Sequence, residues 1–82
     1  MTVRTTRSTV TFRGPFTLKA IDGEQAPGVY EIETDEAVME GNDLTAYRRI
    51  ATLFHVRRGG TTRTYRVDRR DLEAALARDA AA

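Results

Sequence analysis

The segment from Ile50 to Val67 constrains the fold more than any other, because two β-rich runs flank a pair of glycines. Gly59-Gly60 predicts a two-residue hairpin turn of type I′, since glycine adopts positive φ at both central positions without steric cost. The turn fixes a register in which Phe54 lies opposite Tyr65. The other expected pairs are Arg58 with Thr61, Val56 with Arg63, and Thr52 with Val67. The segment therefore predicts two antiparallel strands.

The first of these strands carries apolar side chains on both faces. Phe54 and Val56 share one face, whereas Ala51 and Leu53 share the other. A central strand that is covered on both sides has this pattern. One helix covers only one face of a sheet, so the second face requires either partial closure into a barrel, which we favour, or a partner subunit.

A helix is predicted directly after the second strand. Asp68 is a good N-cap, and Val67 and Leu72 occupy the two positions of a hydrophobic staple. Leu72, Ala75, Leu76 and Asp79 then follow the i, i+3, i+4, i+7 spacing of one helical face. We expect a helix from about Arg69 to Arg78, which must dock on the sheet because a helix of this length is marginal alone.

The first half of the chain predicts shorter elements. Alternation around Val10 and Phe12 indicates a strand that Gly14-Pro15 interrupts and that resumes from Phe16 to Ala20. Turns are expected at Asp22-Gly23 and Pro27-Gly28, and a second strand over Val29–Thr34. Val38-Met39 is either a very short strand or a helical turn, Leu44–Tyr47 is either a helical turn or a loop, and residues 1–8 either fray or extend the first strand.

Eighty-two residues make one domain, with an expected radius of gyration of roughly 12 Å. We predict a single α+β domain over residues 1–82, with residues 1–8 and 80–82 disordered. Its antiparallel sheet has about four to five strands, twisted or partly closed into a barrel, and one C-terminal helix. The lack of cysteine, of a long apolar run and of a signal sequence favours a cytoplasmic protein without membrane contact.

Few residues in the chain suit catalysis or metal binding. His55 is the only histidine, Ser8 is the only serine, and there is no cysteine. A Cys-His pair is therefore excluded, and the spacing of the carboxylates matches no metal-binding loop. We expect a protein that is not an enzyme and that has no cofactor, no metal and no catalytic residue.

Opposite charges occupy separate stretches of the chain. Residues 24–46 contain seven acids and no Lys or Arg, whereas residues 47–71 contain eight arginines and two aspartates. The two blocks either pair across neighbouring strands, which we favour, or lie on separate faces. The basic block defines a candidate binding surface of Tyr47, Arg48, Arg49, His55, Arg57, Arg58, Arg63, Arg66, Arg69 and Arg70.

The preferred functional class is a small interaction module that binds a protein partner or itself. Small sheets recruit strands at an exposed edge, which here would be Val10–Phe12 or Tyr30–Ile32. The alternative is a nucleic-acid-binding domain that uses the Arg-rich hairpin 48–70, because arginine forks bind phosphate and tyrosine stacks on bases. A sequence pI of 8.2 and the absence of a known nucleic-acid-binding motif weaken this alternative.

The run GVYEIETDEAVMEGNDLTAYRR over residues 28–49, together with the helix sequence VDRRDLEAAL, resembles small uncharacterised bacterial proteins of high-GC genomes. The resemblance covers residues 10–79. It implies no activity, cofactor or site residue.

Overall fold

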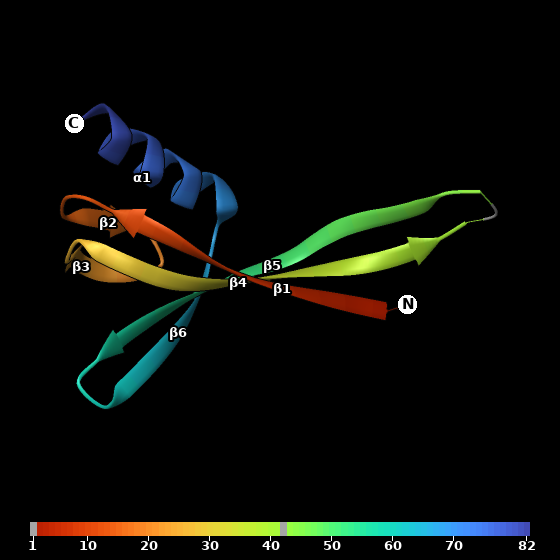
Figure 1. The fold of residues 1–82 in the computed structure, drawn as a ribbon, viewed down its shortest axis with the longest axis horizontal. Helices are drawn as coiled ribbons and strands as arrows, with labels where there is room; N and C mark the ends of the chain where they lie inside the picture. Colours follow the sequence, from red (N-terminus) through yellow and green to blue (C-terminus); the bar gives the residue numbers. More distant parts are fainter. Residues whose placement is uncertain (1, 42) are drawn as a thin grey trace.

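The computed structural model describes residues 2–41 and 43–82, which form six strands and one helix (Figure 1). The elements are β1 (Thr2–Phe12), β2 (Phe16–Leu18), β3 (Ile21–Gln25), β4 (Gly28–Glu40), β5 (Thr45–Arg58), β6 (Thr61–Val67) and α1 (Arg69–Ala81). A four-stranded antiparallel sheet has the order β1-β4-β5-β6, and β2 and β3 form a separate pair. This α+β architecture confirms the predicted fold class. The sheet is open, so the barrel alternative is wrong.

The hairpin of β5 and β6 has the predicted register throughout. Phe54 lies opposite Tyr65, and the other three expected pairs are also present. The turn differs, because positive φ occurs at Gly59 (57°) and not at Gly60. Only the first central residue of a type II′ turn needs positive φ, so this turn matches type II′, and the predicted type I′ is wrong.

Strands β4 and β5 are longer than the sequence predicts. β4 runs without interruption to Glu40, and β5 already begins at Thr45, where we expected short or helical pieces. Asp35 pairs with Ala51 and Glu36 with Arg49, which leaves Ile50 as an extra residue. This is a β-bulge, and a bulge bends its strand and increases the local twist.

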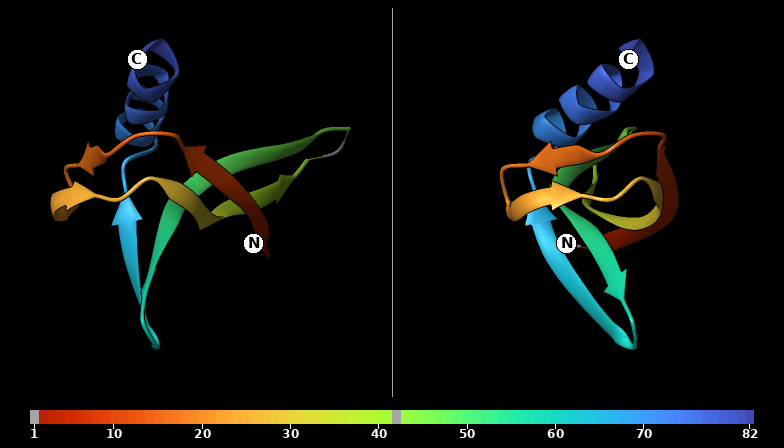
Figure 2. Two further views of the ribbon diagram at one scale, coloured as in Figure 1. Left: turned by 60° about the vertical axis from the view of Figure 1, so that its left-hand side comes forward. Right: turned by 90° about the vertical axis from the view of Figure 1, so that its left-hand side faces the viewer.

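The core lies on one face of the sheet, near the ends of β1, β4 and β5 that the β2–β3 hairpin covers (Figure 2). Its buried residues are Phe12, Phe16, Leu18, Ile21, Phe54, Val56, Val67, Leu72 and Ala75. The ring of Phe16 stacks on Phe12 at 3.6 Å between centroids, and Tyr30 stacks on Phe54 at 5.1 Å. Aromatic side chains from β1, β2, β4 and β5 therefore form the centre of the core.

Helix α1 packs mainly on β2, and its Leu72 and Ala75 belong to the same core cluster as buried residues of the large sheet (Figures 1 and 2). Asp68 caps it as predicted, since its side chain accepts a hydrogen bond from the backbone N–H of Arg70. Two carboxylates on the helix then bind the chain on either side of β2. Asp71 accepts from the N–H of Lys19 at 2.8 Å, and Asp79 accepts from the N–H groups of Arg13 and Gly14 at 2.8 and 2.9 Å.

The β2–β3 hairpin reverses at Lys19 and Ala20. We predicted the turn at Asp22-Gly23, but these two residues lie within β3, where Gly23 has a φ of 81°. The pairing of β2 with β3 shifts register between Phe16 and Leu18. The glycine therefore serves the irregular pairing of the strand and not the turn.

The molecule is more extended than an average domain of its length. Its radius of gyration is 14.8 Å and its longest dimension is 46 Å. Residues 2–7, 35–41 and 43–50, which we call the arm, project away from α1 and the β2–β3 hairpin (Figures 1 and 2); we call the rest of the molecule the body. Residues 2–8 are strand and residues 80–81 are helix, where the sequence led us to expect disordered ends. Within the described residues no helix is long and apolar enough to cross a membrane.

Candidate functional site

The arginines of the predicted binding surface are divided among several parts of the molecule. Residues opposite each other in an antiparallel ladder share a face, so Arg58 and Arg63 lie on the same face as Val56. Arg57 and Arg66 lie on the opposite face. The remaining four are Arg48 and Arg49, which lie in the arm, and Arg69 and Arg70, which begin the helix. The structure thus brings Arg58 and Arg63 together at one pocket and places Arg49, Arg66 and Arg69 around another.

Three of these arginines contact the protein itself. Arg66 donates to the carbonyl of Ile50 at 3.0 Å, which satisfies an acceptor at the β-bulge. Arg69 pairs with Glu73 one helical turn later, and Arg58 donates to the side chain of Gln25. These contacts give the arginines structural roles that their spacing in the sequence does not reveal.

His55 lies on the face of β5 opposite Phe54. Its Nδ1 is 2.8 Å from the hydroxyl of Thr64, and its Nε2 is 3.5 Å from a carboxylate oxygen of Glu33. Tyr47 lies in the arm, where the guanidinium of Arg4 sits 4.0 Å from its ring centroid. Among residues 2–41 and 43–82, no three His, Cys, Asp or Glu side chains form a group that could hold a metal ion.

The edge strand β1 has three features that favour pairing with another strand. It has 11 residues, about twice the usual strand length of roughly 5–6. It pairs with β4 in an unbroken register from Thr2 to Phe12, and nearly all its residues are exposed. Natural edge strands are usually protected by a bulge, a proline, a short length or unpaired charge. β1 has neither proline nor bulge.

The charges of β1 are matched by the adjacent strand. Arg4 contacts Glu36 at 2.7 Å, and Arg7 contacts Glu33 at 3.3 Å. The hydrogen bond to Glu36 raises the pKa of Arg4 further above its ordinary value. These two arginines are the only charged residues of β1, so the edge presents little net charge. Among the described residues, the acids of β4 thus form their ion pairs with arginines on β1, whereas on the other side of β4 Glu36 lies opposite Arg49 of the basic block in the strand ladder.

The other edge strand, β6, is better protected. It has seven residues and carries Arg63 and Arg66. Within the described part of the chain, no carboxylate lies within 4.0 Å of either guanidinium. Unpaired positive charge of this kind opposes the approach of another strand. The two edges of the same sheet thus differ in their capacity to pair.

Exposed apolar side chains gather in the arm. Of the six large hydrophobic residues that are exposed among those described, five lie there, and the sixth is Val29. The five are Val3, Met39, Leu44, Tyr47 and Ile50. Val3 and Met39 lie on one face of the arm and Tyr47 lies on the other, so apolar side chains are exposed on both faces. The arm therefore combines an open edge with apolar surface.

Sequence reasoning placed an edge at Val10–Phe12 or Tyr30–Ile32. The structure has the first of these segments in edge strand β1 and the second in interior strand β4. We expected residues 1–8 either to fray or to extend the first strand and did not place an edge there, although the run TVRTTR is rich in β-branched residues that favour strands. The chain matches no protein-family model, no curated protein and no solved structure.

Proposed function

We propose that this chain is a binding module that pairs with a second copy of itself through the edge of β1. The two sheets then form one continuous antiparallel sheet across a two-fold axis. The observation that carries the proposal is the long, unbroken and charge-matched edge of β1. Strand addition at such an edge satisfies backbone donors and acceptors that otherwise bind only water.

The sequence of β1 suits pairing with itself. In the continuous sheet, the same face of both copies lies on the same side. Residues that oppose each other across the two β1 strands are then both even-numbered or both odd-numbered. Arg4 of one copy therefore never faces Arg7 of the other. In registers centred on Thr5 or Thr6, no arginine faces an arginine. Threonine pairs then occupy the centre, and they are favourable cross-strand neighbours. The strand is therefore self-complementary, as a two-fold interface requires.

The arm adds side chains to this interface. Val3 lies on β1 itself, and Tyr47 packs beside Arg4. The arm also carries both signs of charge, with Glu36 and Glu40 on β4 and Arg48 on β5. Surfaces that contain both signs can match a second copy without accumulating charge. A second copy thus accounts for the edge and for the exposed arm together.

Sedimentation velocity over a range of protein concentrations tests the proposal. We expect a concentration-dependent dimer that Thr6→Lys weakens by about fivefold or more. In the register centred on Thr6, the new lysine faces itself across the axis. In the register centred on Thr5, it faces Arg4 of the second copy. Both arrangements oppose like charges, so one variant tests both registers.

Thr62→Lys is the matched control, because it introduces the same charge on the other edge of the sheet. It should leave the dimer unchanged. A chain that stays monomeric at all concentrations would overturn self-association. Dissociation by Thr62→Lys with no effect of Thr6→Lys would assign the interface to β6 and reject β1.

A further inference from the structure

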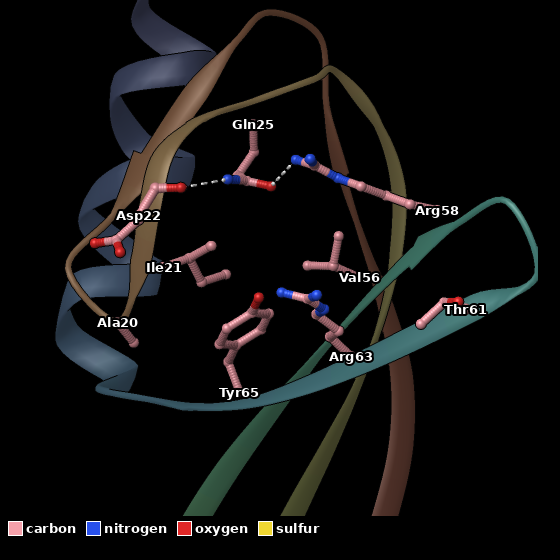
Figure 3. Close-up of a pocket in the computed structure, with 9 residues that line it drawn as sticks. All are labelled: Ala20, Ile21, Asp22, Gln25, Val56, Arg58, Thr61, Arg63 and Tyr65. Atoms are coloured by element: carbon pink, nitrogen blue, oxygen red, sulfur yellow. Dashed lines mark hydrogen bonds between the residues drawn. The ribbon is translucent and has the colours of Figure 1, made fainter.

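A pocket of about 550 Å³ lies between the β2–β3 hairpin and the β5–β6 hairpin (Figure 3). Its lining residues are Ala20, Ile21, Asp22, Gln25, Val56, Arg58, Thr61, Arg63 and Tyr65. Pockets for small organic molecules typically have volumes of about 300–1,000 Å³. The size of this pocket therefore suits a small molecule.

The guanidinium of Arg58 is held in place at the wall of the pocket. It donates to the side-chain oxygen of Gln25 at 3.0 Å. Gln25 is buried, and its amide nitrogen donates to the carbonyls of Asp22 and Gly23 at 3.3 and 3.2 Å. Because Gln25 is itself fixed, Arg58 is oriented before any ligand arrives. A guanidinium has five N–H donors, so most of them are free for a ligand.

A second guanidinium enters the pocket from the neighbouring strand. Figure 3 shows the side chain of Arg63 directed into the same space as the hydroxyl of Tyr65, whereas the carboxylate of Asp22 points away from both arginines. Buried Ile21 and Val56 form apolar wall between these groups. The pocket thus joins a positively charged region to an apolar surface.

We propose that this pocket binds a small organic phosphate monoester. The phosphate lies between Arg58 and Arg63, whose planar forks each bind two oxygens of an oxyanion. Two guanidiniums and the Tyr65 hydroxyl offer more donors than the two oxygens of a carboxylate can use, but they match the three terminal oxygens of a phosphate. The organic group packs on Ile21 and Val56. This site is independent of the proposed dimer, because β1 forms the opposite edge of the sheet.

Titration of the ¹⁵N-labelled protein with phenyl phosphate, followed by two-dimensional NMR, tests the proposal. Benzoate and sodium chloride at equal ionic strength are the comparison titrations. We expect saturable shifts at the amides of residues that line the pocket, and weaker binding of benzoate. Arg63→Gln should lower the affinity for phenyl phosphate by about tenfold or more, because it removes a charge-assisted hydrogen-bonding fork.

Arg57→Gln is the matched control, since it removes the same charge from the opposite face of the hairpin. It should change the affinity for phenyl phosphate by less than about twofold, because Arg57 lies on the opposite face of the hairpin and salt screens interactions between exposed charges. Equal losses of affinity in Arg63→Gln and Arg57→Gln would show that phenyl phosphate is attracted by positive charge in general, and would overturn the site. Shifts that do not saturate would also overturn it, and benzoate binding as tightly as phenyl phosphate would overturn the phosphate assignment. Arg63→Lys keeps the charge and should still weaken binding, which provides a second variant if Arg63→Gln fails to fold.

Discussion

The body and the arm are built from the same strands but are stabilised differently. In the body, Phe54 and Val56 alternate with half-buried residues and lie beneath the β2–β3 hairpin. In the arm, the same strand exposes Tyr47 and Ile50, and its partner strand exposes Met39. The bulge at Ile50 marks the change from one to the other. Strand length alone therefore does not indicate how much of a strand is buried.

The difference shows what holds each region. The body gains stability from apolar side chains that are far apart in the sequence, as the packing of Phe12, Phe16 and Phe54 illustrates. The arm is held by its backbone ladder and by ion pairs such as Arg4–Glu36. Exposed ion pairs typically contribute only about 0–1 kcal/mol each. The arm is thus the region that gains most from a second copy.

The strongest test of the difference between body and arm is a pair of side-chain truncations to alanine. Phe54→Ala should destabilise the monomer by about 3–5 kcal/mol, since it opens a cavity beneath Tyr30 and Phe16. Leu44→Ala, at the exposed tip of the arm, should change the free energy of unfolding by no more than about 0.5 kcal/mol. Urea unfolding at protein concentrations where sedimentation shows a monomer provides both values. Similar losses of unfolding free energy in the two variants would mean that the arm is packed as tightly as the core.

The sequence predicted the body better than the arm. The pairing of β5 with β6 and the cap at Asp68 follow from local signals, namely a glycine pair, alternation and an N-cap residue. The continuation of β4 to Glu40 depends on two ladders that the pattern of β4 alone does not show: residues 35–38 pair with β1, which is distant in the sequence, and residues 36–40 pair with residues 45–49 of β5. Long-range pairing of this kind cannot be derived from the pattern of one segment.

The candidate site was predictable only in part. Arginine spacing identified Arg58 and Arg63, which do lie together, but it did not separate them from Arg57 and Arg66 on the opposite face. Once the register is known, the alternation of side chains along each strand shows which arginines share a face. The role of Gln25 in fixing Arg58 comes from the approach of two hairpins, and no local pattern indicates it.

The turn of the body's hairpin offers a second test, with a smaller effect. Gly59→Ala should cost about 1 kcal/mol, because the positive φ at this position is unfavourable for residues with a Cβ atom. Gly60→Ala should change the free energy of unfolding by no more than about 0.5 kcal/mol, since Gly60 lacks positive φ and a Cβ there meets open space. Thermal unfolding of the two variants measures both effects. Equal losses of unfolding free energy in Gly59→Ala and Gly60→Ala would instead indicate a type I′ turn.

The smallest effect concerns Asp79, which joins the helix to the segment between β1 and β2. Hydrogen bonds from the N–H groups of Arg13 and Gly14 lower the pKa of its carboxyl group below the ordinary value. A lowered pKa in the folded state stabilises the protein at pH values above the unfolded pKa of about 3.9, and this stabilisation is lost as the pH falls through the folded pKa. Asp79→Asn should therefore lower the urea midpoint at pH 7 and reduce the further loss of stability between about pH 5 and pH 2.

Asp43→Asn, near the tip of the arm, is the control with the same chemical change. It should leave the free energy of unfolding at pH 7 within about 0.5 kcal/mol of the original value, because Asp43 is exposed. A urea midpoint that Asp79→Asn leaves unchanged at pH 7 would mean that the contact to Arg13 and Gly14 does not hold the helix. The helix would then depend on Leu72 and Ala75 alone, and the body would be less tightly joined than its hydrogen bonds indicate.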